Sequence, residues 1–213
     1  MTTRTLFVAC TLLGTWLAAG CANTGTESTA QVSDAEVQQV IMASFKEKGQ
    51  AGMDRLNQSE LQKSCSMAAL DPEGLPQAKR TALEQAALAA VKYPADGKYL
   101  GDWKSGEKIA QTGVGFQFSD KPDTPAGGNC YACHQLAPQE LSYGNLGPSL
   151  YQYGKVRGSS EEIMRYTWAK IWNSHAYNAC SNMPRFGAEG ILTEAQLKDV
   201  MALLMAPDSP VNK

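Results

Sequence analysis

Two cysteines and a histidine stand close together in the middle of the chain, within the run NCYACHQ that begins at Asn129. Two residues separate Cys130 from Cys133, and His134 follows directly, which is the CxxCH attachment pattern of a c-type haem. In this chemistry the two thiols add across the two vinyl groups of haem, and their spacing brings both sulfurs to one porphyrin edge. The adjacent imidazole then binds the iron. The pattern therefore predicts one covalent haem c and a redox function.

The same three residues have two other interpretations. A CxxC followed by histidine can arise by chance, and it can also be half of a zinc site. A structural zinc takes four ligands, whereas the chain contains no second CxxC and no HxxxH. Haem is therefore the preferred interpretation.

The first twenty residues have the composition of an export signal. Arg4 is their one charged residue, and residues 6–19 are almost wholly apolar. This run is too short to span a bilayer and fits a signal-peptide core. It ends in LAAGC, which resembles a bacterial lipobox with Cys21 as the acylated residue. The alternative is ordinary cleavage near Ala22, which would remove Cys21. We therefore expect a periplasmic protein, either soluble or held to the membrane by a lipid anchor.

The length and net charge of the chain limit its domain organisation and the classes of function that remain possible. The chain has 213 residues and a formal charge of −2, which becomes −3 when Arg4 leaves with the signal. Such a chain does not bind nucleic acid by electrostatic attraction. About 190 residues remain, enough for one domain with an extension or for two small domains. We expect a signal peptide with lipobox at 1–20, a tether and helical extension at 21–95, and a CxxCH domain at 96–213.

The cysteine count predicts a disulfide. Of six cysteines, one lies in the signal, one in the lipobox and two in CxxCH, which leaves Cys65 and Cys180. Two spare thiols in an oxidising compartment favour a bond between them. It would close a loop of more than 100 residues, worth roughly 4–5 kcal/mol in the chain-entropy treatment. The alternatives are two buried free thiols, or Cys180 as a haem ligand.

Helical periodicity in both halves predicts an all-α fold. In the first half we expect a helix capped by Ser33 and Glu36 and ended by Gly49, then helices at 54–69 and 76–93. This half has no histidine and no catalytic constellation, so we expect an extension that packs on the second half. Its expected apolar positions are Val37, Val40, Ile41, Phe45, Leu83, Ala87, Ala90 and Val91.

In the second half, helices are expected from Ser159 with Glu162 as its capping-box partner, and from Thr193 with Gln196. The last helix should end before Pro207. Its expected apolar face is Leu197, Val200, Met201 and Leu204.

Three segments of this half together resemble the SoxX family, the small haem subunits of bacterial SoxAX complexes. They are GGNCYACHQLAPQELSYGNLGPSLYQYG, NACSNMPRFG and ILTEAQLKDVMALLM. The resemblance covers residues 101–205. Single motifs such as CxxCH or GPxL are shared by all class I cytochromes c, and their combination with the MPRFG loop is what points to SoxX.

This resemblance implies a class I cytochrome c fold and a set of haem contacts. Residues 101–113 would form the first helix of that fold, and Gly106 would lie where two helices cross closely. The Pro148 carbonyl would accept a hydrogen bond from the His134 ring, which raises the basicity of that ligand. Met183, in the MPRFG loop, occupies the place of the second axial ligand. The metal ligands would thus be His134 and Met183.

Two other residues compete with Met183 as the sixth ligand. His175 is the second of the two histidines in the chain and lies in the polar run NSHAYN, where we expect it to face solvent or a partner. Cys180 is the other competitor. Met164, Met201 and Met205 lie on expected helices, where a core role fits them better.

The resemblance also implies a function and partners. SoxAX joins thiosulfate to a cysteine of the carrier protein SoxYZ and releases two electrons, an L-cysteine S-thiosulfotransferase activity. The SoxA-type cytochrome partner holds the catalytic site, and this subunit would pass electrons to a soluble cytochrome. No residue of this chain would be catalytic. The alternatives are a stand-alone periplasmic electron carrier without a sulfur substrate, and a structural lipoprotein adaptor that binds haem.

Overall fold

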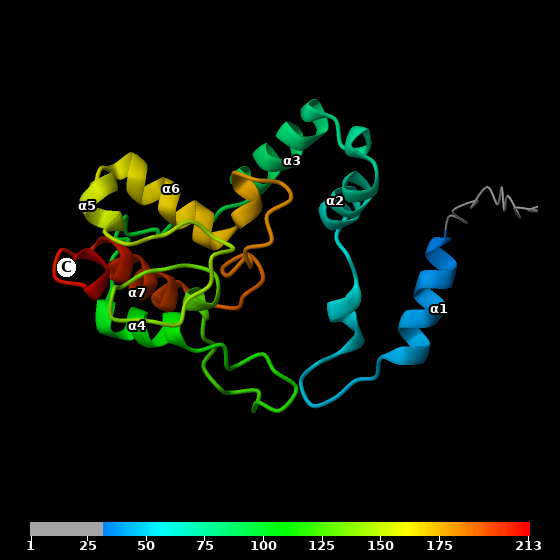
Figure 1. The fold of residues 1–213 in the computed structure, drawn as a ribbon, viewed down its shortest axis with the longest axis horizontal. Coiled ribbons are helices and arrows are strands. Elements are labelled where there is room, and N and C mark those ends of the chain that lie inside the picture. Colours follow the sequence, from blue (N-terminus) through cyan, green and yellow to red (C-terminus); the bar gives the residue numbers. More distant parts are fainter. Residues whose placement is uncertain (1–31) are drawn as a thin grey trace, which may run out of the picture. The chain divides into compact units, whose positions relative to one another are not determined.

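The computed structural model describes residues 32–213. Within this range the chain forms α-helices and short 3₁₀ turns and contains no β-strand, so the all-α class is confirmed (Figure 1). The helices are α1 (Asp34–Ser44), α2 (Glu60–Leu70), α3 (Gln77–Ala89), α4 (Trp103–Gln111), α5 (Tyr153–Arg157), α6 (Glu161–Trp172) and α7 (Glu194–Met205). Two compact units divide the chain, with the boundary between Ala43 and Ser44.

Helix α1 begins at the predicted capping box. The Glu36 carboxylate accepts from the Ser33 backbone N–H at 2.8 Å, and the Ser33 hydroxyl accepts from the Glu36 N–H at 3.3 Å. None of the residues of α1 is buried, and Val40 is 63% exposed. The helix ends at Ser44 rather than near Gly49, because the backbone of Lys48 pairs with Ala51 instead of continuing the helix.

Helices α2 and α3 are shorter than expected. Residues Met53–Leu56 form a separate 3₁₀ turn, and α2 starts only after Ser59, whose side chain forms a capping box with Gln62. Helix α3 ends at Ala89 rather than Tyr93. Beyond this end, the Lys92 carbonyl accepts a hydrogen bond at 2.8 Å from the indole of Trp168, a side chain in the core.

The core of the larger unit is built around α7. The four predicted apolar residues of this helix are buried, and Thr193 caps it with Gln196 as predicted. Helix α4 and helix α6 both pack on α7, which lies between them (Figure 1). Gly106 permits the close crossing of α4, since a Cβ there would overlap the carbonyl of Asp199.

The start of α6 and the helix before it differ from the prediction. Ser160, not Ser159, caps α6 by accepting from the Ile163 N–H at 3.3 Å. The predicted box with Glu162 is therefore wrong by one residue. Helix α5 was not predicted, because its five residues are too few to show a periodicity.

Residues 44–95 belong to the same unit as the CxxCH segment. The Gln50 amide donates to the carbonyls of Gly115 and Gln117, both at 3.0 Å, and the Arg55 guanidinium donates to the Phe116 carbonyl at 2.6 Å. These bonds hold the loop that leads from α4 toward CxxCH. This part of the first half thus packs on the second half, as expected.

Candidate haem attachment site

A tight turn brings together the residues of the CxxCH motif. The backbone N–H of Asn129 donates to the Thr112 carbonyl at 2.8 Å, which ties the motif to the end of α4. The carbonyl of Cys130 then accepts from the N–H groups of both Cys133 (3.1 Å) and His134 (2.9 Å). The 3₁₀ turn Cys130–Ala132 follows from these bonds. One turn of chain therefore presents two thiols and one imidazole.

The two thiols of the motif are free and half-buried. Burial raises the pKa of the Cys130 thiol to about 12, so at neutral pH this group keeps its proton. Among residues 32–213 no cluster of three or more His, Cys, Asp or Glu side chains could hold a metal ion. These described residues therefore offer no complete ligand set for a structural zinc.

The ring of His134 is oriented by its neighbours in the segment 147–148. Its Nδ1 lies 2.7 Å from the Pro148 carbonyl oxygen, which can only accept, so Nδ1 carries the proton. The free lone pair is then on Nε2, the atom available to a metal. The ring also lies on Gly147, where a Cβ would overlap it. The contact with Pro148 is the one that the family resemblance implies.

Backbone hydrogen bonds keep this segment beside the motif. Gly147 donates to the Cys133 carbonyl at 2.8 Å, and Gly144 donates to the Tyr131 carbonyl at the same distance. A Cβ at Gly144 would overlap the backbone of Ala132. Gly144 is thus required by the close approach of two stretches of backbone, and Gly147 by the close approach of the His134 ring.

The loop that carries Met183 is held by serine hydroxyls. Ser174 donates to the Met183 carbonyl at 2.6 Å, and the Met183 N–H donates to the Ser181 hydroxyl at 3.2 Å. The side chain of Met183 is half-buried and packs on the same apolar core as Cys130. Met201 and Met205, in contrast, are fully within the core, as expected for helical methionines.

The expectation that His175 faces solvent or a partner is wrong. Its side chain is only 6% exposed, in the 3₁₀ turn Ser174–Ala176, and its Nε2 donates to the Ser181 carbonyl at 3.3 Å. The polar character of NSHAYN misled the prediction, because these polar groups bond to one another, as when the Asn173 side chain accepts from the His175 N–H. Burial, together with the charge of Arg185, lowers the pKa of His175.

Cys65 and Cys180 form a disulfide. The bond joins α2 to the loop at a point three residues before Met183. Helix α3 holds the same loop, since the Glu84 carboxylate accepts from the Ala179 N–H at 3.0 Å. The extension therefore fixes the Met183 loop from two helices. Cys21 lies outside the described residues.

Four residues with a clear part in this site were not predicted from sequence: Ser174, Ser181, Glu84 and Gly144. Ser174 bonds to Met183, nine positions away, and Ser181 bonds to His175 and Met183, six and two positions away. Glu84 bonds to Ala179, 95 positions away. Pairs in irregular loops or far apart in the chain leave no periodic signal. Gly144 and Gly147 are different. Glycines spaced by three residues shortly after CxxCH could have indicated a close approach of backbone to the motif.

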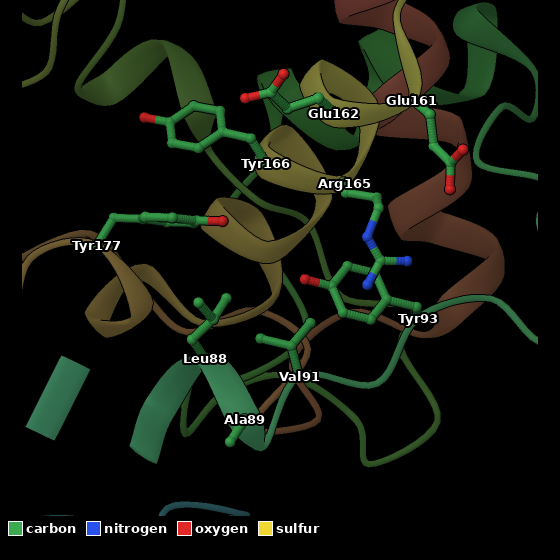
Figure 2. A pocket seen from close by; sticks show the side chains of 9 residues that line it. All are labelled: Leu88, Ala89, Val91, Tyr93, Glu161, Glu162, Arg165, Tyr166 and Tyr177. Atoms are coloured by element: carbon green, nitrogen blue, oxygen red, sulfur yellow. The ribbon is translucent and has the colours of Figure 1, made fainter. Parts of the chain in front are cut away.

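Two neighbouring cavities lie away from CxxCH, beside the first turns of α6. Their volumes are about 890 and 690 Å³, and they share Tyr93, Glu161 and Arg165. Figure 2 shows the larger one, with the Arg165 guanidinium stacked on the Tyr93 ring, 3.9 Å from its centroid. The rest of its lining is Leu88, Ala89, Val91, Glu162, Tyr166 and Tyr177. No predicted site residue lines either cavity.

Comparison with known proteins gives a relative but no family profile. No family model matches the chain. An uncharacterized lipoprotein of Aquifex aeolicus (strain VF5) is 37% identical over 158 residues, which cover 73% of each chain. In the described range, no helix combines the length and apolar character that crossing a membrane requires. With this identity over nearly three quarters of both sequences, the protein belongs to the same family as the Aquifex lipoprotein.

Proposed function

We propose that this chain is a monohaem c-type cytochrome of the class I fold, and that it is the electron-accepting subunit of a SoxAX-type complex. The observation that carries the proposal is the 2.7 Å contact between His134 Nδ1 and the Pro148 carbonyl, beside two free thiols. This contact leaves Nε2 for iron and fixes the plane of the ring. The sequence resemblance over residues 101–205 supplies the choice of SoxX among such cytochromes.

Each residue of the site has a distinct role in this proposal. Cys130 and Cys133 become thioether anchors when their S–H groups add across the vinyl groups, so no oxidant is needed. His134 and Met183 would be the two residues that bind the haem iron. A bound haem supplies the uptake and release of one electron at a time. A thioether opposite a histidine gives a higher potential than a second histidine does, which suits an acceptor.

The proposal assigns no catalytic residue to this chain. With His134 and Met183 both bound, a substrate has no open coordination position at the iron, so sulfur chemistry must take place on a SoxA-type partner. There, thiosulfate joins the sulfur of a SoxYZ cysteine. A sulfur–sulfur bond forms, the thiol proton is released and two electrons leave. This subunit would receive those electrons one by one and deliver them to a soluble cytochrome.

We further propose that Cys21 is lipidated and that the chain is held at a membrane facing the periplasm. Two observations support this, the LAAGC sequence before Cys21 and the name of the Aquifex relative, a lipoprotein. A lipobox cysteine carries several acyl chains, and more than one chain is what stable anchoring requires.

The test of the proposed function is partner-dependent reduction. The purified holoprotein is mixed with thiosulfate and a SoxYZ-type carrier, with and without a SoxA-type cytochrome, and haem reduction is followed by absorbance. We expect reduction only when the partner is present, and a stable complex of the two cytochromes. Turnover by this chain alone, or no complex, would instead favour a stand-alone carrier.

A further inference from the structure

The backbone carbonyl and the backbone N–H of Met183 both form hydrogen bonds with serine side chains. Its carbonyl accepts from the Ser174 hydroxyl at 2.6 Å, and its N–H donates to the Ser181 hydroxyl at 3.2 Å. A loop residue on a protein surface usually bonds to water instead. The backbone of this one residue is thus fixed by protein groups on both sides.

Ser174 lies in a buried turn that is bonded to helix α6. Its side chain is fully buried, with 0% exposure, in the 3₁₀ turn Ser174–Ala176 against which α3 packs. The Lys170 ammonium donates to the Ser174 carbonyl at 3.0 Å, which ties this turn to the last turn of α6. Ser181, in contrast, lies in the same loop as Met183. Among the contacts that hold this loop, the Ser174 hydroxyl is the one that joins Met183 itself to a buried residue of the turn Ser174–Ala176.

Pro184 makes this contact more effective. A residue that precedes proline is restricted to extended backbone conformations, so Met183 has few alternatives once its carbonyl is held. The disulfide at Cys180 restrains the loop three residues earlier. Between these two restraints, the Ser174 hydroxyl donates a hydrogen bond directly to the carbonyl of Met183, the residue that carries the thioether.

We propose that Ser174 is the positioning residue for the Met183 thioether: its hydroxyl holds the Met183 carbonyl and thereby keeps the sulfur at the iron. This inference rests on the proposed function, since it takes Met183 as the axial ligand. Without the bond, a carbonyl facing buried surroundings loses its partner, which disfavours the loop conformation seen here. The sulfur then leaves the iron more often, and an external ligand can enter.

The test measures how fast imidazole binds the ferric holoprotein, together with the sulfur-to-iron charge-transfer band and the haem potential. Replacing Ser174 by alanine should increase the apparent binding rate by about tenfold, weaken the band and lower the potential. The matched control is Ser209→Ala. Ser209 is equally buried and donates a similar bond, 2.7 Å, to the Leu203 carbonyl, but at the end of α7.

Ser209→Ala should lower the unfolding midpoint yet leave imidazole binding, band and potential unchanged. Equal imidazole rates in Ser174→Ala and wild type, or equal increases in both alanine variants, would overturn the proposal. If Ser174→Ala does not fold, Ser174→Cys replaces it, because a thiol is a weaker donor of similar size. Unchanged rates in that variant would likewise overturn it.

Failure of the underlying function is distinguishable from failure of this inference. If the wild-type holoprotein lacks the sulfur-to-iron band, Met183 is not the ligand and the proposed ligand set fails. If the band is present and Ser174→Ala leaves all three readouts unchanged, the ligand set stands and the positioning role of Ser174 is wrong.

Discussion

The ring of His134 rests on the backbone of Gly147, so closely that a Cβ at position 147 would overlap the imidazole. The next residue, Pro148, accepts the hydrogen bond of Nδ1 from the same ring. Packing and hydrogen bonding thus come from adjacent residues of one segment. A histidine held in this way has one tautomer and one orientation, which is what an iron ligand requires.

Replacing Gly147 by alanine should disturb this ring specifically. The added methyl group forces either the ring or the segment to move, at a cost of about 1–3 kcal/mol in folding free energy. We expect a lower yield of holoprotein and a lower midpoint in chemical unfolding. Gly74→Ala is the control, because a Cβ there meets its nearest atom at 3.7 Å, an ordinary contact. Equal behaviour of the two variants would contradict the role assigned to Gly147.

Replacing Met183 by alanine should remove the sulfur-to-iron band from the ferric spectrum. It should also lower the haem potential, because a thioether favours ferrous iron more than nitrogen or oxygen ligands do. The control is Met201→Leu, a substitution of similar volume in the core that should keep both properties. If the band survives in Met183→Ala, another residue is the ligand.

Removing the disulfide should cost a large part of the stability. The two cysteines are 115 positions apart, so the chain-entropy treatment predicts a loss of roughly 4–5 kcal/mol in the Cys65→Ser/Cys180→Ser double variant. Because Cys180 is close to Met183, we also expect faster imidazole binding to the ferric protein. Denaturant unfolding and peptide mass spectrometry of the unreduced wild type measure these effects. Two separately alkylated thiols in the native protein would exclude the bond.

His175 should make folding stability sensitive to mild acid. Burial, then the positive charge of Arg185, lowers its pKa below the ordinary value of 6.5, so the folded chain favours the neutral ring. The contribution of His175 is therefore complete above pH 6.5 and is lost as the pH falls toward the lower, folded value. His175→Gln keeps an N–H donor for Ser181 but does not titrate. We expect a shallower decline in unfolding free energy below pH 6.5 for this variant, and an identical decline would refute the role of His175.

Local signals predicted the parts of the fold that local interactions create. The boxes Ser33/Glu36 and Thr193/Gln196 lie within four residues of chain, and both form as predicted. The apolar face of α7 follows from its 3.6-residue period. Adjacent serines show the limit of such signals, since both Ser159 and Ser160 are suitable caps by residue type and the structure has Ser160 in that position.

The features that were not predicted from the sequence depend on hydrogen bonds outside regular helices, between residues that no local pattern connects. His175 looked solvent-exposed because its neighbours are polar, yet Ser181 satisfies its ring within the protein. Helix α3 ends at Ala89, and a distant indole, that of Trp168, bonds to the Lys92 carbonyl beyond that end. The hydroxyl of Ser174 likewise bonds to a partner nine positions away in an irregular loop. None of these pairings has a period or a motif from which it could be read.

Covalent attachment of haem through Cys130 and Cys133 tests the central claim most directly. The full chain is produced in a bacterium with c-type cytochrome maturation machinery, and its intact mass is measured after complete denaturation. The account predicts one haem that stays bound to the denatured wild type and is absent from the Cys130→Ala/Cys133→Ala variant. A wild-type chain that emerges from this host with both thiols unmodified would contradict it.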